Sequence, residues 1–352
     1  MKKKLFSFIL ILILGLSLSA CAKKTKVDND PVYSFHTELQ EAYLKDSYSN
    51  FALYANGTEN LSTPNAIVLS WDDSVISPSD SYIVKISENA DFKAYKEYKT
   101  KENKVPIYNL KIATKYYYTI SNGTDTSSVI FFNVKGDAPR NLNVDGLTNV
   151  RDVGGWKAGN SRVKQNLLFR SSKFNDDEST ELVISEEGIN ILVNDFHIKT
   201  EIDLRKTSDN ENGGITSSPL GNSVNYVSIP MKSSGNVLTL NPNEVAQVFK
   251  LLADENNYPI IFHCSIGTDR TGLIAFLVNA LLGVSEEDLY RDYLFSNFGL
   301  IYDMRTPSAV KNYLNAINMK SGDTLKDRTF NYLKSIGLSE KELNNIIKIM
   351  TE

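Results

Sequence analysis

The sequence predicts two folded units in series, an all-β sandwich followed by an α/β domain whose mostly parallel sheet is flanked by helices. The chain has 352 residues, about twice the length of a typical domain. Residues 51–136 contain short runs of alternating apolar side chains separated by turn signals, which is typical of a sandwich. From residue 137 onward, strand-like and helix-like segments alternate, which favours a parallel sheet.

Composition and charge narrow the function classes. Hydrophobic residues make up 41% of the chain and charged residues 23%, as in ordinary globular proteins. There are 38 Lys and Arg residues against 42 Asp and Glu residues, a formal net charge of −4. This balance excludes a nucleic-acid-binding protein that relies on bulk positive charge. Two cysteines and three histidines exclude a disulfide scaffold and a zinc site built from several Cys and His ligands, so we expect no metal and no other cofactor.

The N-terminus predicts export and membrane attachment. Three lysines precede an apolar run over residues 5–20, which is shorter than the roughly 20 residues that a membrane-spanning helix needs. Residues 1–20 are therefore predicted to be an export signal. The end of this run and Cys21 resemble the bacterial lipobox, which implies that Cys21 is lipidated and anchors the chain to the extracytoplasmic face of the bacterial cell membrane. A plain secretory signal or an uncleaved anchor helix is the alternative.

Residues 21–50 are predicted to be a tether that follows the lipidated cysteine. The segment begins with three lysines within five residues and stays polar as far as Pro31. Such a chain behaves largely as a flexible coil. Residues 37–46 predict a short helix, so we expect the tether to be partly ordered.

Residues 51–136 predict the strands of the sandwich and one clear turn. Apolar and aromatic runs predict strands over 66–71, 82–87, 116–120 and 129–134. Asn122-Gly123 is a strong signal for a hairpin turn. Together with Trp71, this pattern resembles a fibronectin type III domain, and another small β-sandwich is the alternative. We expect the unit to be a spacer or a docking module for a protein or glycan partner.

Residues 137–352 predict the α/β domain. Strands are expected over 199–204 and 260–262, and helices over 243–253, 273–282 and 285–293. The second of these helices is nearly all apolar and ends at Gly283, which predicts a helix buried on every side.

A ten-residue segment that joins the second of these strands to the buried helix carries the chemistry. It runs from His263 to Gly272 and contains Cys264, Gly267 and Arg270. Residues between a strand end and a helix start can curl so that their N–H groups point to one centre, which binds a phosphate dianion. Gly267 permits the tight turn. Arg270 closes the ring with a planar fork that matches two phosphate oxygens.

Cys264 is predicted to be the nucleophile. A free cysteine has a pKa of about 8.5, and inward amides, a helix N-terminus and Arg270 all favour its thiolate. The thiolate would attack phosphorus and form a phosphocysteine that water then hydrolyses, without a metal. If Cys21 carries lipid, Cys264 has no disulfide partner, and a lone thiol outside the cytoplasm is open to oxidation. A buried structural cysteine and an inactive phosphate-binding domain are the alternatives.

Several motifs in chain order resemble the bacterial tyrosine and lipid phosphatase family, which belongs to the cysteine-dependent protein tyrosine phosphatases. The motifs lie at residues 149–155, 169–172, 203–205, 263–271 and 292–294. The resemblance implies a phosphatase-type α/β domain at 137–352 and activity on phosphotyrosine, often also on phosphoserine, phosphothreonine or phosphoinositides. The family usually has Lys where this chain has Thr268, which lowers our expectation of phosphoinositide activity.

The leaving group needs a proton donor. The family resemblance assigns this role to Asp269, and Asp203 at a strand end is the second candidate, with a salt bridge to an arginine as its other interpretation. His263 is expected to orient the loop, and Thr271 to share its hydroxyl with the sulfur of Cys264 or with the attacking water. Substrate-binding residues are expected to be Ser265, Ile266, Gly267, Thr268 and Asp203.

These observations predict one leading function and two others. The leading prediction is a surface-anchored, metal-independent phosphomonoesterase, most simply a protein-tyrosine phosphatase with dual or broader specificity. Its substrate would be a phosphorylated protein or a small phosphoester. The first alternative is an inositol phosphate or phosphoinositide phosphatase. The second is a non-catalytic surface-binding lipoprotein.

Overall fold

The computed structural model describes residues 30–175, 182–207, 211–233 and 235–351. The predicted export signal and Cys21 lie outside these residues. Among the helices described, none is long and apolar enough to cross a membrane.

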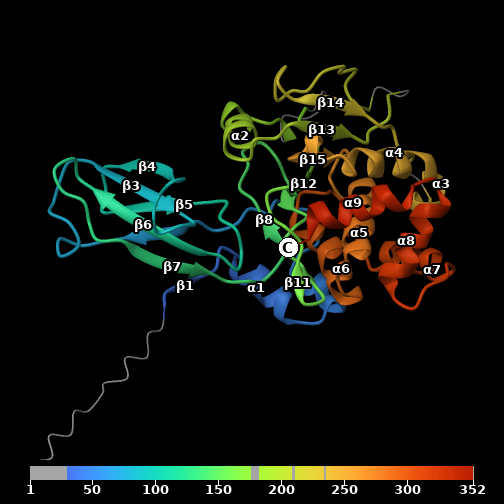
Figure 1. Cartoon of the computed structure of the whole chain (residues 1–352), viewed down its shortest axis with the longest axis horizontal. Coiled ribbons are helices and arrows are strands. Elements are labelled where there is room, and N and C mark those ends of the chain that lie inside the picture. Colours follow the sequence, from blue (N-terminus) through green and yellow to red (C-terminus); the bar gives the residue numbers. More distant parts are fainter. Residues whose placement is uncertain (1–29, 176–181, 208–210, 234, 352) are drawn as a thin grey trace, which may run out of the picture. The chain divides into compact units, whose positions relative to one another are not determined.

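A six-stranded mixed sheet organises the C-terminal part of the chain (Figure 1). In spatial order its strands are β14 (Asn225–Ser228), β13 (Thr200–Asp203), β15 (Ile260–His263), β12 (Leu168–Ser171), β9 (Arg151–Asp152) and β8 (Arg140–Asn141). The first four run parallel, and β9 and β8 add antiparallel pairs at one edge. The register places Ser171 and Asp203 beside His263, so the carboxyl ends of three central strands meet at one edge of the sheet.

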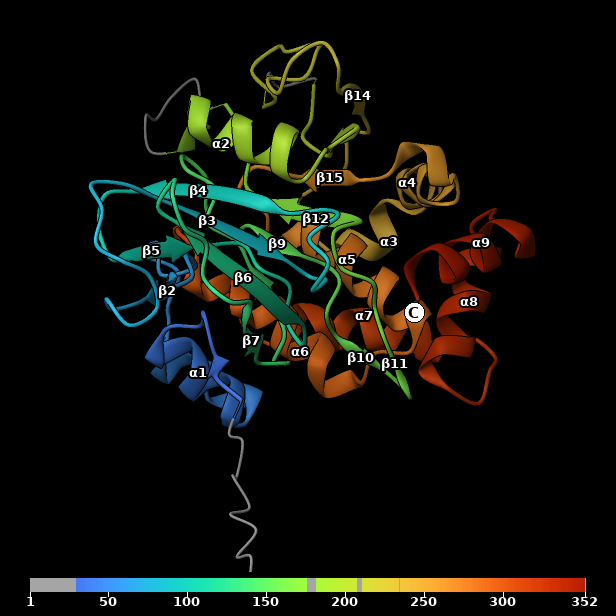
Figure 2. The same cartoon turned by 60° about the vertical axis from the view of Figure 1, so that its left-hand side comes forward.

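Helices cover both faces of this sheet, as the alternation of segments predicts. In Figure 2, α2 (Glu186–Asn190) and α5 (Asp269–Leu282) lie on opposite sides of β15. Ile260 and Phe262 pack into the larger core cluster with α5, whereas Ile261 packs into a second cluster on the side of α2. The strand is therefore buried on both faces, which explains its unbroken apolar sequence.

The predicted helices of this part are confirmed, with small shifts at their ends. The helices that follow β14 are α3 (Val237–Leu240), α4 (Pro242–Leu252), α5, α6 (Glu286–Leu294), α7 (Ser308–Asn318), α8 (Leu325–Ser335) and α9 (Glu340–Met350). Helix α5 begins four residues before the predicted Leu273, because its first turn is polar and carries no apolar periodicity. All of its residues after Asp269 are buried, and Gly283 ends it with a φ of 92°.

The N-terminal β unit contains two sheets that share one core. The five-stranded sheet has the order β1 (Val32–Tyr33), β7 (Ile130–Val134), β6 (Lys115–Ser121), β3 (Tyr82–Ser87) and β4 (Lys96–Thr100), and β2 (Ile67–Ser70) pairs with β5 (Lys104–Ile107). Ile67 and Leu69 of the small sheet pack with Val84 and Ile86 of the large one. Alternate residues of β3 point into this core, as predicted.

Residues 37–53 pack on the α/β domain, whereas β1 and Phe35 belong to the β unit, which corrects the prediction of a flexible tether for residues 30–50. The predicted helix is present as α1 (Glu38–Lys45), with a capping box between Thr37 and Gln40. Tyr43 on this helix is fully buried and contacts the Phe298 ring at 5.7 Å between centroids. Tyr48 stacks on Tyr290 at 4.4 Å. These aromatic anchors stand among polar residues, so no apolar run reveals them in the sequence.

The β unit and the α/β domain make direct contacts. Residues 31–352 form one compact unit. Arg140, fully buried, donates to the carbonyls of Asn109 at 2.6 Å and Leu110 at 2.9 Å and pairs with Asp152 at 2.8 Å. These bonds connect a loop of the β unit to the edge of the six-stranded sheet.

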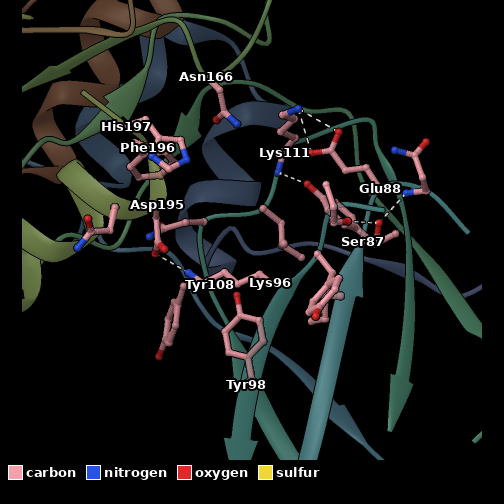
Figure 3. A pocket seen from close by; sticks show the side chains of 18 of the residues that line it. Ser87, Glu88, Lys96, Tyr98, Tyr108, Lys111, Asn166, Asp195, Phe196 and His197 are labelled. Carbon is pink, nitrogen blue, oxygen red and sulfur yellow. Dashed lines mark hydrogen bonds and ion pairs between the residues drawn. The ribbon is translucent and has the colours of Figure 1, made fainter. Parts of the chain in front are cut away.

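A cavity of about 590 Å³ lies beside this contact (Figure 3). Four of its charged side chains form two ion pairs, Lys96 of β4 with Asp195 and Lys111 with Glu88. The Lys96–Asp195 pair crosses from the β unit to the α/β domain, so it adds to the connection between them.

Candidate active site

The segment from Cys264 to Thr268 forms a loop between β15 and α5. Gly267 lies at its tightest point with a φ of 68°. A Cβ atom there would lie 2.3 Å from the carbonyl oxygen of Ser171, so only glycine fits. The loop therefore lies directly against the end of β12, at the edge where the carboxyl ends of the parallel strands meet.

Two side chains hold the loop from behind. Asn149 Nδ2 donates to the carbonyls of Ile266 at 3.1 Å and Gly267 at 2.9 Å, and Arg170 Nη2 donates to the Gly267 carbonyl at 2.8 Å. The C=O and N–H of one peptide unit point in opposite directions. Tying the carbonyls of Ile266 and Gly267 to the rear therefore turns the amides of Gly267 and Thr268 to the front.

A buried ion-pair network supports these two side chains. Asp292 of α6 binds Arg151 Nε at 3.0 Å and Arg170 Nη1 at 2.7 Å, and Arg151 in turn donates to Asn149. Burial opposes the ionisation of Asp292 most strongly, yet the two guanidinium groups keep its pKa below the usual value. The sequence motifs at 149–155, 169–172 and 292–294 thus meet behind the loop, a role that their spacing in sequence does not reveal.

Cys264 lies at the base of the loop and is 2% exposed. Burial raises its pKa most strongly, but the Arg270 guanidinium and the hydroxyl and amide of Thr271 outweigh burial, so the pKa lies below the usual value. The Thr271 hydroxyl has no oxygen or nitrogen partner in the described part of the chain, which leaves it free for the sulfur. Thr271 therefore lies close enough to Cys264 to act on its pKa.

Arg270 is held beside Cys264 by Glu211, a residue that the sequence analysis missed. Both terminal nitrogens of Arg270 contact the Glu211 carboxylate, and Nη1 also donates to the Leu204 carbonyl at 3.2 Å. Ser265 Oγ donates to Glu211 at 2.6 Å. Burial opposes ionisation of Glu211, but the bonds from Arg270 and Ser265 lower its pKa to about 2. Glu211 follows a segment without periodicity, so no sequence signal marks it.

Asp269 begins α5 and faces outward from the loop. Arg305 binds both of its carboxylate oxygens at 3.0 Å, through Nε and Nη2, and the Tyr293 hydroxyl donates to Oδ1 at 2.9 Å. Asp269 and Arg305 both line a cavity of about 400 Å³. Of the predicted site residues, Asp269 is the one that borders this cavity.

Asp203, the second predicted donor, is fully buried with both oxygens occupied. Arg205 binds them through its backbone amide, Nε and Nη2 at 2.8–3.2 Å, and the Tyr226 hydroxyl donates at 3.0 Å. Burial opposes ionisation, but His263 and Arg205 lower the pKa of Asp203 below its usual value. This arrangement corresponds to the salt bridge that the sequence left open as the other interpretation.

Of the other predicted residues, Thr268 and Ile266 contact Asn149 behind the loop, and His263 lies within the sheet. Thr268 is fully buried and accepts from Asn149 at 3.2 Å, so its side chain faces the rear of the loop and not its mouth. His263 is buried within the sheet and bonds through Nε2 to Glu201 at 3.0 Å. Ile266 contributes its carbonyl to the Asn149 contact. Among the residues that the structure describes, no three His, Cys, Asp or Glu side chains gather as metal ligands do.

Relatives by sequence are tyrosine phosphatases by name. A protein of Cupriavidus necator named as a tyrosine-protein phosphatase is 27% identical over 172 residues, which cover 44% of this chain and 63% of that protein. A tyrosine-protein phosphatase of Nostoc commune is 40% identical over 50 residues, 14% of this chain and 17% of that protein. The matched part therefore spans less than two thirds of the length of either relative.

Solved structures with a detectable likeness include a bacterial protein and a yeast phosphatase. P. aeruginosa TpbA is 21% identical, with a TM-score of 0.32, over 50% of this chain and 97% of that one. The core catalytic domain of a PP-IP phosphatase from S. cerevisiae, in complex with citrate, is 16% identical, with a TM-score of 0.28, over 44% of this chain and 92% of that one.

A family model matches a larger share of this chain than any of these proteins does. The model of the tyrosine phosphatase family covers residues 142–352, which is more than half of the chain and includes every residue of the loop. The family predicted from the motifs is thereby confirmed, and the chain belongs to the tyrosine phosphatase family.

Proposed function

We propose that the protein is a metal-independent phosphomonoesterase, a protein-tyrosine phosphatase that works through a phosphocysteine. One observation carries the proposal: Cys264, with a lowered pKa, lies beside Arg270 under a loop whose carbonyls are tied to the rear. Inward amides and a guanidinium match the charge and geometry of a phosphoryl group.

The reaction proceeds in two displacements. The Cys264 thiolate attacks phosphorus in line, the S–P bond forms, and the P–O bond breaks with its electron pair on the leaving oxygen. Water then attacks the phosphocysteine, the S–P bond breaks, and the thiolate returns. Amides of the segment 265–268 and Arg270 stabilise the charge of the transferring group in both steps.

Asp269 is the better candidate for proton transfer. It stands at the loop and lines a cavity, whereas every oxygen of Asp203 is occupied by Arg205 and Tyr226. We therefore assign Asp203 to the support of the sheet edge and not to the substrate. The charged residues that line this cavity are Asp269, Asp303 and Arg305, two acidic residues against one basic, which disfavours a polyphosphorylated inositol as substrate.

The N-terminal part is proposed to place this enzyme at a membrane surface. Lipidation of Cys21 would hold it on the extracytoplasmic face of the cell membrane, and the β unit would be a fibronectin type III-like sandwich that acts as a spacer or docks a protein or glycan. Two sheets with one shared core support the sandwich. Metabolic labelling with a radioactive fatty acid, lost in Cys21→Ala, tests the anchor.

The test of the activity uses both cysteines. The full-length protein should hydrolyse p-nitrophenyl phosphate in the presence of EDTA, and rapid denaturation during turnover of a radiolabelled substrate should leave labelled phosphate on Cys264. Cys264→Ser should lose turnover by more than about a thousandfold. Cys21→Ala is the matched control, because it removes the other cysteine outside the site and should keep turnover. Equal turnover in Cys264→Ser and wild type would refute the thiolate mechanism.

A further inference from the structure

Residues 57–62 lie between α1 and β2 and pack against the α/β domain. They precede the part of the chain that the family model matches, residues 142–352. The Gly57 amide donates to the Asn297 carbonyl at 2.8 Å, and the Gly57 carbonyl accepts from the Ile301 amide at 2.9 Å. A Cβ atom at Gly57 would lie 2.6 Å from Cγ1 of Ile301, so the two segments are in close contact. Residues 57–62 are therefore held firmly against the domain that carries the active site.

The hydroxyl of Ser62 joins this segment to Asn149, which holds the loop from behind. Ser62 is 4% exposed. The Asn149 amide donates to Ser62 Oγ at 3.0 Å, and this hydroxyl donates to Asn60 Oδ1 at 2.8 Å. The Thr148 hydroxyl donates to the same Asn60 oxygen at 2.9 Å. Because Asn60 takes up the hydroxyl hydrogen of Ser62, a lone pair of Ser62 Oγ is directed at the Asn149 amide.

Asn149 has a φ of 58°, a conformation that is uncommon for residues other than glycine. Contacts on three sides hold it there. Ser62 accepts from its amide, Arg151 donates to its Oδ1, and its Nδ2 donates to the carbonyls of the loop. Of these three contacts, the one with Ser62 fixes the backbone of Asn149, and with it the direction from which the side chain reaches the loop.

Building on the proposed function, we propose that Ser62 is a positioning residue of the active site, supplied by a segment outside the part that matches the family. By accepting the Asn149 amide, Ser62 holds Asn149 in the conformation that directs its Nδ2 at the carbonyls of Ile266 and Gly267. With these carbonyls turned to the rear, the amides of the same peptide units face the phosphoryl group. Ser62 thus acts through Asn149 and not on the substrate itself.

The test compares Ser62→Ala with Ser87→Ala in the full-length protein. Ser87 is also buried, and its hydroxyl accepts from the Asn89 amide at 3.0 Å and donates to the Ala94 carbonyl at 2.6 Å, within the β unit. Each variant therefore loses one accepted and one donated hydrogen bond. We expect both to lose stability in urea, and only Ser62→Ala to lower kcat/KM for p-nitrophenyl phosphate, by about three- to tenfold.

The affinity for inorganic phosphate gives a second measurement at the same loop. Ser62→Ala should weaken phosphate binding by a similar factor, because the loop amides bind the free anion as well as the transferring group. Ser87→Ala should bind phosphate as tightly as wild type. A role of Ser62 in folding alone would lower stability and leave this affinity unchanged, and that result would overturn the proposal.

A double-mutant cycle assigns the effect to Asn149. Asn149→Gly removes the side chain that Ser62 positions, so in that background Ser62→Ala should leave kcat/KM unchanged. An equal loss in both backgrounds would show that Ser62 acts by another route and would overturn the proposal. So would a kcat/KM in Ser62→Ala that equals that of Ser87→Ala.

Asn60 provides the test if Ser62→Ala does not fold. Asn60 is exposed, and Asn60→Ala removes the oxygen that orients the hydroxyls of Ser62 and Thr148. This variant should lower kcat/KM about two- to threefold. Asn60→Asp keeps an oxygen at this position and should keep kcat/KM near that of wild type. Asn60→Ala with full activity would contradict the proposal.

Failure of this inference is separable from failure of the proposed function. A wild-type protein without turnover and without a phosphocysteine contradicts the phosphatase itself, and the phosphate affinities of Ser62→Ala and Ser87→Ala then still decide the role of Ser62. A wild-type protein that turns over its substrate, with equal kcat/KM in these two variants, contradicts only the role of Ser62.

Discussion

Asn149→Gly should weaken the binding of a phosphoryl group by the loop and leave the nucleophile Cys264 unchanged. Asn149 has a φ of 58°, a conformation that glycine adopts without strain, so the substitution removes the side chain and spares the backbone. The lost amide group is the one that ties the carbonyls of Ile266 and Gly267 to the rear of the loop. Without it, the amides of Gly267 and Thr268 are less firmly directed at a phosphoryl group.

The contacts that remain set the size of the effect. After the substitution, the Gly267 carbonyl keeps Arg170 at 2.8 Å, and the Ile266 carbonyl keeps the Thr268 hydroxyl at 3.3 Å. No buried carbonyl is left without a partner, so we expect a cost of about 1–2 kcal/mol in the loop, near that of ordinary hydrogen bonds. The buried Arg151 Nη1 also loses its acceptor on Asn149, which adds to the loss of folding stability. If the free energy lost in the loop is lost from the stabilisation of the transition state, kcat/KM falls about 5–30-fold.

The assay measures kcat/KM for p-nitrophenyl phosphate, inhibition by inorganic phosphate, and urea unfolding. Asn166→Gly is the matched control, because Asn166 has a φ of 66° and its side chain binds Arg140 and not the loop. We expect both variants to lose stability, and only Asn149→Gly to lose activity and phosphate affinity. Equal activity in the two variants would show that the loop amides do not depend on Asn149.

Two further predictions concern buried charges. Glu211→Gln should lower kcat/KM about tenfold, because one charge-assisted contact with Arg270 is lost; a variant as active as wild type would contradict this role. Since its folded pKa of about 2 lies below the ordinary 4.5, Glu211 stabilises the folded state above pH 4.5, and urea titrations should show this advantage over Glu211→Gln disappearing as the pH falls from about 4.5 to about 2. Arg140→Met should lower the free energy of unfolding by about 3–5 kcal/mol, because the buried Asp152 carboxyl, whose pKa burial raises, loses its guanidinium partner and the Asn109 and Leu110 carbonyls lose their donor; an equally stable variant in urea would contradict this contribution of Arg140.

The local chemistry of the site could be predicted from the sequence. A buried strand, a short loop with Cys264, Gly267 and Arg270, and an apolar helix are contiguous, and each is marked by its own periodicity. The fold class of the α/β domain follows from the same local signals.

The partners of the site were decided by the tertiary structure alone. Glu211 lies 59 residues from Arg270, Arg305 lies 36 from Asp269, and Asp292 lies 122 from Arg170. Periodicity in a sequence encodes which face of an element is buried, but not which distant charge will lie opposite it. How the elements pack decides which charges meet. It places Asp203 in an ion pair with Arg205 at the end of β13, and it places Asp269 beside the cavity.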